Sequence, residues 1–490
     1  MKELVIIYLE RMLQVFFGLF TTYILVNNFD ASEYGLYKYM LSFSATFILF
    51  AMLGFNFSNI RFIPEYLSRG EYGKINGQLL IFSVIHVIVL FISILVMLLL
   101  YENGLIKINN QINITCLFLI IIFNFFKYFF SESILCSFSK RLMLTYFRIG
   151  IYVIQFGIVM YAVLMRDVNF EKYVFYYTLS AAIEFLILFS GVLFVYPSVV
   201  REKCVTNINS KMVYRHAWNN YGFTIVNYLR DNAVTIILVS YLFGFTEVSY
   251  YSMALIIPNV IRTFTPSKVF SGFIVPQYVR KYNKTGDDNI IFDGLNLLSK
   301  INVIYLVPAI IYSIFMYKTV IGLAFGDIYV ENSYVLSLFI FGNVFFLSFF
   351  DVNLLLLNII KRSDLVFKLN LLSAINIFII LTYHEYGQFV IGIGNLTSTF
   401  LTVLSFWIVI NKIYKKRIEF NFIDIKVFLY VVFLLSISLM LNDINKIIYS
   451  IIFLPLSLYA AVLLMKSTFL NDQEYSVVVK IIPKKLRALI

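Results

Sequence analysis

The sequence predicts an all-helical integral membrane protein with about fourteen transmembrane spans. Hydrophobic residues make up 61% of the 490 residues and charged residues only 13%, with a mean hydropathy of +0.85. Soluble domains carry about 25% charged residues, so an ordinary soluble fold is excluded. Apolar runs of about 20 residues recur along the chain, which is the length of a helix that crosses a bilayer core. These runs lack the alternation of polar and apolar residues that is typical of transmembrane barrel strands.

Each apolar run is 18 to 26 residues long, which suits a tilted spanning helix. The expected spans are residues 4–26, 34–56, 79–100, 112–135, 143–165, 172–196, 217–242, 247–270, 296–317, 333–358, 365–383, 388–410, 424–441 and 446–465. No cleavable signal is expected, because Glu10 and Arg11 interrupt the first run and no small-residue cleavage site follows it.

The distribution of basic residues predicts the orientation in the membrane. With the N-terminus placed inside, 28 of the 39 Lys and Arg residues fall on the cytoplasmic side, 5 on the opposite side and 6 within spans. Positive charge collects on the cytoplasmic side of membrane proteins, so we expect both termini in the cytoplasm. The same bias accounts for the net charge of +12 without a nucleic-acid partner.

Two segments of the first half recur in the second half in the same order. FDASEYGLYKYMLSF, which starts at Phe29, is echoed by FGFTEVSYYSMALII, which starts at Phe243, so that Glu33 matches Glu247 at an offset of 214 residues. IPEYLSRGEYGK is echoed by VPQYVRKYNK, and Pro64 matches a second proline 212 residues later. Six spans separate the echoes, so both halves enter the membrane in the same sense. This indicates parallel repeats about an axis along the membrane normal.

The repeat predicts the domain organisation, with two six-helix lobes around a central cavity and an appended helix pair. The expected parts are an N-terminal lobe at 1–197, a cytoplasmic linker at 198–216, a C-terminal lobe at 217–411, the appended helices at 412–466 and a cytoplasmic tail at 467–490. After the second span, we expect the chain to leave the membrane into a basic interfacial segment, with Arg61 and Arg69, that Pro64 stops.

The stretch from Asn28 to Leu80 also carries a resemblance to a known family. A polar turn is followed by EYGLY, an apolar helix, LGF and RFIPEY. This order resembles the O-antigen and capsular repeat-unit flippases, the polysaccharide-transporter branch of the multidrug/oligosaccharidyl-lipid/polysaccharide exporter superfamily. The length, span number and charge layout of the chain match as well. The resemblance implies a transporter, not an enzyme, that moves undecaprenyl-pyrophosphate-linked oligosaccharide across the bacterial inner membrane by alternating access. Its implied partners are that lipid-linked oligosaccharide, the bilayer, and the polymerase and chain-length machinery of O-antigen, capsule or exopolysaccharide synthesis.

Charged residues inside the spans are the candidate functional residues. Each costs about 2.5 to 3.5 kcal/mol at the bilayer centre, so it usually faces protein or a water-filled cavity. The basic ones are Arg11, Lys38, Lys127, Arg230, Arg262 and Lys268, and the acidic ones are Glu10, Glu132, Glu184, Asp231 and Asp351. The basic excess suits a cavity that attracts anions. The expected contacts for pyrophosphate or an anionic sugar are Arg11, Lys38, Arg230, Arg262 and Lys268, and the expected ion-coupling residues are Glu10, Asp231 and Asp351.

Some of these charges also fit a purely structural role. Adjacent residues on a helix point about 100° apart, so Glu10 and Arg11 do not bridge each other. One member would face the cavity while the other pairs with another helix, or both would be satisfied between packed helices. Lys38 either lines the cavity or extends to the interface. Lys127 and Glu132 are expected to form a structural pair.

The eighth span has the most suggestive pattern, because Pro258 and Pro266 flank Arg262 and Lys268 follows directly. Each proline removes a backbone hydrogen bond and kinks the helix, which is compatible with a moving gate that binds phosphate. The alternative is that the two cations mark the cytoplasmic interface. Lipid II flippases have basic residues on their first, second and eighth helices. Arg11, Lys38 and Arg262 match that arrangement by helix.

Several classes of function lack their sequence signals. There is no GxxxxGK[ST] loop for a nucleotide. Three Cys and three His residues have no ligand-like spacing, so we expect no cofactor and no metal. A multidrug or ion antiporter of the same fold is one alternative, although it would favour an acidic cavity. A membrane polysaccharide polymerase is a weaker one, because it needs a long external loop with catalytic groups and the longest here is about 317–332.

Overall fold

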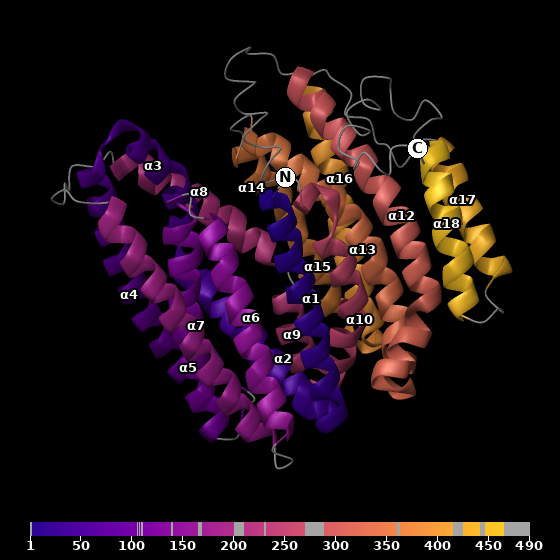
Figure 1. Ribbon diagram of the computed structural model, residues 1–490, viewed down its shortest axis with the longest axis horizontal. Helices are drawn as coiled ribbons and strands as arrows, with labels where there is room; N and C mark the ends of the chain where they lie inside the picture. The colour runs from indigo at the N-terminus through magenta and orange to yellow at the C-terminus, as the bar shows by residue number, and fades with distance from the viewer. Residues whose placement is uncertain are drawn as a thin grey trace. The chain divides into compact units, whose positions relative to one another are not determined.

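The computed structural model describes residues 2–104, 106, 108, 111–138, 141–164, 169–199, 210–229, 232–269, 289–359, 363–414, 425–441 and 446–464. All regular secondary structure within these ranges is helical, which confirms the predicted fold class. The chain divides into two compact units, Met1–Ser252 and Met253–Ile490. Figure 1 shows the helices of each unit.

The first unit contains nine α-helices, one π-helix and the beginning of a tenth α-helix among its described residues. They are α1 (Lys2–Asn28), α2 (Ala31–Met52), α3 (Phe55–Arg69), α4 (Tyr72–Glu102), α5 (Gln111–Tyr128), η1 (Phe129–Leu135), α6 (Arg141–Leu164), α7 (Phe170–Val199), α8 (Ser210–Tyr228), α9 (Asn232–Leu242) and α10 (Phe245–Thr263). Because α8 and α9 pack against α3 and α2, this unit extends past the predicted linker to Ser252.

Helix α2 lies at the centre of the first unit and packs against α1, α4, α5, α8 and α9. Its start is fixed by a capping box, in which the backbone N–H of Asp30 donates to the Glu33 carboxylate at 3.1 Å. Glu247 holds the same third position in α10, so the sequence echo marks equivalent helix starts. Helix α2 ends where Leu53 and Gly54 adopt left-handed backbone conformations, with φ of 46° and 70°.

Two glycines allow other segments to approach this helix closely. A Cβ at Gly35 would lie 1.8 Å from the carbonyl oxygen of Phe245, at the start of α10. A Cβ at Gly54 would lie 2.4 Å from the carbonyl oxygen of Ala217 in α8. Glycine is therefore required at both contacts, because any larger residue would push backbone segments apart.

The segment after α2 differs from the prediction, because Pro64 does not stop it. Helix α3 continues through Pro64 to Arg69 and ends at Gly70, where φ is 71° and the Gly70 N–H donates to the carbonyl of Leu67 at 3.3 Å. The carbonyl that Pro64 leaves without an amide partner belongs to Ile60, which lies on the exposed face of the helix. Burial of Phe62 and other residues on the opposite face holds the helix against α4, η1 and α8.

The seventh expected span, 217–242, corresponds to α8 and α9 in the structure. Helix α8 ends at Tyr228 and is followed by a turn at Leu229, α9 begins at Asn232, and Arg230 and Asp231 lie outside the described residues. The sequence at this point is LRDN, and Asp and Asn are residues that favour a helix start. A new helix start is therefore compatible with the local sequence, although the apolar residues on both sides suggest one span.

A π-helix continues α5 and brings a polar residue into the interior. Within η1 the backbone N–H of Cys136 donates to the carbonyl of Ser131 at 3.0 Å, which is the five-residue spacing of a π-turn. The hydroxyl of Ser133 then accepts a hydrogen bond from the side-chain amide of Asn59 at 2.7 Å. Gln78 donates in turn to the Asn59 carbonyl oxygen at 2.7 Å. The three buried side chains connect η1, α3 and α4.

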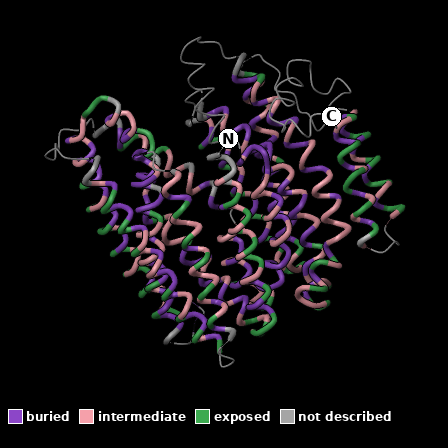
Figure 2. Tube along the Cα trace, viewed as in Figure 1, coloured by how far each residue is buried: buried purple, intermediate pink, exposed green. Residues whose placement is uncertain are grey.

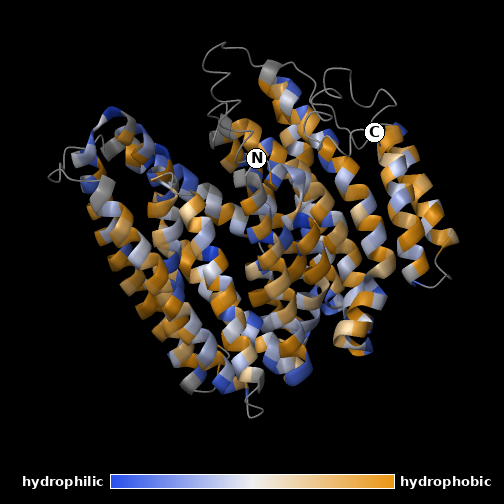
Figure 3. Ribbon diagram, viewed as in Figure 1, coloured by the Kyte–Doolittle hydropathy of each residue, from blue (hydrophilic) through white to orange (hydrophobic). Residues whose placement is uncertain are grey.

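Ten of the described helical segments are long and apolar enough to cross a membrane, and α9, α17 and α18 are shorter apolar helices. Helix α4 is the clearest case, because it is strongly apolar and mostly exposed (Figures 2 and 3). Its exposed residues include Leu80, Val87, Phe91, Ile92 and Leu99, each more than half accessible. A helix with so much exposed apolar surface is compatible with lipid and not with water.

The second unit contains the rest of α10 and a packed group of helices among its described residues. They are α12 (Asn289–Phe325), α13 (Asp327–Ile359), α14 (Ser363–Asn370), η2 (Leu371–Ser373), α15 (Ala374–Tyr383), η3 (His384–Tyr386), α16 (Phe389–Tyr414), α17 (Ile425–Met440) and α18 (Lys446–Leu464). Helix α13 packs against both α12 and α16, and α15 packs against α16. Helices α17 and α18 pack against each other and against α12.

The eighth expected span is interrupted just before Pro266, whereas α10 continues through Pro258. Helix α10 ends at Thr263, and a short helical turn resumes at Pro266. The backbone N–H of Ser267 donates to the side chain of Asn302 at 3.0 Å, which ties this turn to α12 within the second unit. The break shortens α10 relative to the predicted span 247–270.

Candidate functional site

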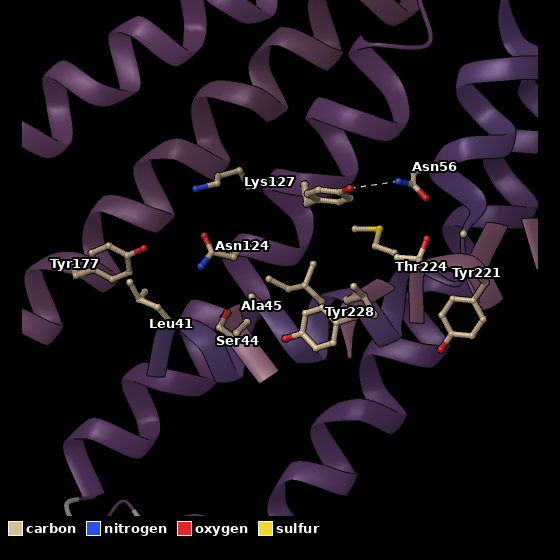
Figure 4. Close-up of a pocket in the computed structure, with 16 residues that line it drawn as sticks. Leu41, Ser44, Ala45, Asn56, Asn124, Lys127, Tyr177, Tyr221, Thr224 and Tyr228 are labelled. Atoms are coloured by element: carbon tan, nitrogen blue, oxygen red, sulfur yellow. Dashed lines mark hydrogen bonds between the residues drawn. The ribbon is translucent and has the colours of Figure 1, made fainter. Parts of the chain in front are cut away.

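The candidate site is a cavity of about 480 Å³ inside the first unit, called here the first cavity (Figure 4). Residues of α2, α3, α5, α7, α8 and α9 line it. Its polar lining consists of Ser44, Asn56, Asn124, Lys127, Tyr128, Tyr177, Tyr221, Thr224 and Tyr228, and the remainder is mostly aliphatic. A cavity with an apolar wall and a small number of polar groups is the usual form of a small-ligand site.

The polar groups gather on two sides of the first cavity. Figure 4 shows Lys127, Asn124 and Tyr177 on one side, and Asn56 and Thr224 on the other. The Asn56 side-chain amide donates to the Tyr128 hydroxyl at 3.4 Å, and the Thr224 hydroxyl donates to the carbonyl of Asn220 at 2.7 Å. Both sides therefore combine hydrogen-bonding groups with aromatic rings, which is the chemistry that binds sugars and phosphates.

Three buried polar atoms of this lining have no hydrogen-bond partner. They are the hydroxyl oxygen of Ser44 and the side-chain oxygens of Asn56 and Asn124. A buried polar atom without a partner costs about 1 to 3 kcal/mol, so a ligand with donor groups would recover this free energy. Hydroxyl groups of a sugar have the required chemistry.

The positive charge of the first cavity comes from Lys127 on α5. Its ammonium group forms an ion pair with the carboxylate of Glu184 on α7, and the amide of Gln155 on α6 donates to the other oxygen of the same carboxylate. The Glu184 side chain is 1% exposed, whereas the Lys127 side chain is 33% exposed. The lysine therefore has an accessible side, and the carboxylate does not.

A second cavity of about 270 Å³ lies in the same unit and is lined by residues of α1, α2, α6 and α7. Lys38 lines it, with its ammonium group 5.2 Å from the ring centre of Tyr34 and 5.9 Å from that of Tyr37. These distances allow cation–π attraction. Lys38 therefore lines a cavity inside the first unit. Gln155 also lines the second cavity, and Tyr177 lines both.

The predicted pair on the first span separates as expected from its spacing. Glu10 is buried and forms an ion pair with Arg148 on α6, with a nitrogen–oxygen distance of 3.5 Å. Arg11 lies on a different face of α1, is partly exposed and is near Tyr8. Neither residue is among the lining residues of the two cavities.

The other predicted site residues lie outside these cavities or outside the described residues. Arg262 lies in the last turn of α10, where its Nε atom is buried without a hydrogen bond. Lys268 lies in the helical turn after Pro266, and Asp351 is half-buried on α13. All three belong to the second unit. Arg230 and Asp231 lie outside the described residues.

In the structure, Lys127 pairs with a carboxylate on another helix. The sequence interpretation pairs it with Glu132, five residues away on the same span, whereas its ion pair in the structure is with Glu184. The side chain of Glu132 lies outside the described part of the chain. Residues five apart on a helix share a face only loosely, while α5 and α7 pack side by side. A signal was present in the sequence, because Glu184 and Lys127 are isolated opposite charges on separate spans.

A histidine lies beside the first cavity on α8, outside the ten candidate spans. His216 contacts the Ser58 hydroxyl through Nδ1 at 3.2 Å and packs edge-on to the Phe62 ring. Burial, with a smaller contribution from the positive charge of Arg61, lowers the pKa of His216 to about 4. The imidazole is therefore neutral at physiological pH and packs as a structural residue.

Comparisons with known proteins support the fold but not a family. No protein-family model matches the sequence, and no curated protein matches it. Among solved structures, the chain is similar to the lipid II flippase MurJ in an inward closed conformation, with 16% sequence identity and a TM-score of 0.71. The match covers 95% of this chain and 99% of that chain. The chain therefore has the MurJ-like all-helical membrane fold over nearly its whole length.

Proposed function

We propose that this protein is a flippase that moves undecaprenyl-pyrophosphate-linked oligosaccharide repeat units outward across the bacterial inner membrane, for O-antigen, capsule or exopolysaccharide synthesis. The observation that carries the proposal is the full-length similarity of the fold to a lipid II flippase, combined with a lysine-bearing polar cavity. The local resemblance to repeat-unit flippases between Asn28 and Leu80 supports the finer choice of substrate.

The first cavity has groups suited to the polar part of such a substrate. A diphosphate that enters an apolar environment loses its hydration, and a charged ammonium group such as that of Lys127 compensates for part of this loss. The tyrosines and amides of the lining suit sugar rings and hydroxyls. Arg11, Lys38, Arg230, Arg262 and Lys268 stay the predicted anion contacts, and Glu10, Asp231 and Asp351 the predicted ion-coupling residues.

The direct test is transport by the purified protein in proteoliposomes. A fluorescent lipid-linked oligosaccharide is loaded, and its transbilayer movement is followed with a membrane-impermeant quencher. We expect movement above protein-free liposomes, and Lys127→Met should slow it by about tenfold or more, because a charge-assisted contact is worth at least about 1.4 kcal/mol.

A matched control is Lys318→Met. Lys318 is also a lysine in a spanning helix, α12, but it lies over the ring of Tyr334 in α13 and lines neither cavity. This variant should transport like the wild type. Absence of movement in the wild type, with movement of cationic drugs or with glycosyl transfer instead, would replace the proposal by a multidrug antiporter or a polymerase.

A further inference from the structure

The Glu184 carboxylate lies between one lining residue of each cavity of the first unit. Lys127 lines the first cavity, Gln155 lines the second, and both side chains bind the Glu184 carboxylate between them. One oxygen of the carboxylate accepts from the ammonium group and the other from the amide. A group in this position can respond to events in either cavity.

The surroundings of Glu184 make its negative charge dependent on Lys127. Tyr37 on α2, Tyr152 on α6 and Tyr177 on α7 lie within electrostatic range of the carboxylate, and each is neutral as a phenol. Beyond Tyr152 lies the ion pair of Glu10 and Arg148, whose charges offset each other.

Two neighbouring groups complete this environment. On α5, Asn124 contributes an uncharged amide close to Lys127. On η1, the side chain of Glu132 lies outside the described residues. Lys127 therefore supplies the positive charge that directly contacts the carboxylate.

An anion in the first cavity would compete with Glu184 for the same ammonium group. The lysine can move toward the anion, because its side chain is flexible and one third exposed. The carboxylate cannot follow, because it is buried on α7. A buried carboxylate that loses its counter-charge is strongly unfavourable, and proton uptake relieves this penalty.

We propose that Glu184 is a proton-binding site whose protonation is linked to the binding of a diphosphate anion by Lys127. A proton from solvent bonds to the carboxylate oxygen that Lys127 leaves, which gives a neutral carboxylic acid, while Gln155 keeps its bond to the other oxygen. Lys127 stays an ammonium group throughout, so one anion and one proton enter together. This linkage rests on the proposed function, because the anion is the diphosphate of the lipid-linked sugar.

The test measures proton uptake on binding of a defined probe to the full-length protein in nanodiscs. The probe is farnesyl-diphospho-N-acetylglucosamine, a diphosphate diester that does not titrate between about pH 6 and 8. Calorimetry in buffers of different ionisation enthalpy gives the number of protons taken up. We expect the wild type to take up a proton with the probe, and its affinity to rise by up to about tenfold for each unit of pH decrease.

The variants separate the linkage from mere binding. Glu184→Gln should bind the probe without proton uptake and with an affinity independent of pH. Lys127→Met should lose binding. Glu71→Gln is the matched control, because Glu71 is also a carboxylate paired with a lysine, 3.1 Å from Lys74, but lines neither cavity, and it should behave like the wild type.

Each failure has a distinct reading. A wild type that binds the probe without proton uptake, or a Glu184→Gln variant that still takes up a proton, overturns the linkage and leaves the proposed function standing. A wild type that binds no probe at any pH contradicts the proposed function and the linkage together.

Discussion

The sharpest stability prediction concerns Lys127→Met, which removes a cation and keeps a side chain of similar length. Glu184 would remain buried with a hydrogen bond from Gln155 but without its paired ammonium group. Breaking a buried ion pair by removal of one partner typically costs about 3 to 5 kcal/mol. The pair therefore stabilises the packing of α5 on α7 only while both members are present.

The cost has an upper bound, because an unpaired carboxylate can always take up a proton. For an ordinary glutamate side chain, which titrates near 4.3 in water, protonation at pH 7 costs about 3.7 kcal/mol. At pH 5 the same step costs about 1 kcal/mol. We therefore expect Lys127→Met to lower the free energy of unfolding by about 3 to 4 kcal/mol at pH 7, and by about 1 kcal/mol at pH 5.

The measurement is reversible unfolding of the detergent-solubilised protein at both pH values. The double variant Lys127→Met/Glu184→Gln is the control, because it removes the stranded charge and should recover most of the lost stability at pH 7. A loss that is the same at pH 7 and pH 5, or a double variant no more stable than Lys127→Met, would refute the reasoning that a stranded carboxylate causes the effect.

Three further predictions follow from packing and burial. Gly35→Ala should lower the free energy of unfolding by about 1 to 3 kcal/mol, because the added Cβ would meet backbone atoms. The midpoint of thermal unfolding measures this loss. Gly18→Ala is the control, because its Cβ meets no atom within 4 Å, and it should be neutral or slightly stabilising. Asn59→Leu should lower the free energy of unfolding by about 2 kcal/mol, because Gln78 loses its buried acceptor; an unchanged midpoint would contradict this. The pKa of His216 is about 4 in the folded protein, against 6.5 for the free side chain. Because the unfolded chain binds a proton at this residue more readily, the contribution of His216 to the free energy of unfolding is fully present above pH 6.5 and is lost as the pH falls toward 4. His216→Gln should make the midpoint less sensitive to acid over that range, and an unaltered pH profile would show that this histidine does not contribute.

The sequence predicted most of the fold because bilayer-length apolar runs are a strong signal. The helix class and most span positions follow from composition and run length alone, and the matched positions of Glu33 and Glu247 at their helix starts also follow. The separate helices α8 and α9 do not follow from the sequence, since the polar LRDN tetrapeptide is short beside the apolar residues around it. Helix α3 continues past Pro64 because its buried face packs against neighbouring helices. The helix propensity of the local sequence does not predict this continuation.

The candidate site was harder to predict because it depends on which spans are neighbours. Lys127 and Glu184 are isolated opposite charges inside the membrane, but they are 57 residues apart, and the sequence does not show that their helices are neighbours. The candidates that the sequence suggested were all charged residues, whereas the first cavity also has uncharged lining residues such as Asn56 and Asn124. Amides and tyrosines inside apolar spans are common, so they stand out only when helices bring them together.

The π-helix η1 has a consequence for how this span tolerates changes in length. A π-turn holds one residue more than an α-turn of the same height. The span therefore contains an extra residue within Phe129–Leu135. Loss of a single amino acid there would leave ordinary α-helical geometry, with the chain on both sides still presenting its original faces. The same loss in the middle of α4 would rotate everything beyond it by about 100°. Length variation among descendants of this gene should therefore concentrate at η1 and spare the neighbouring spans.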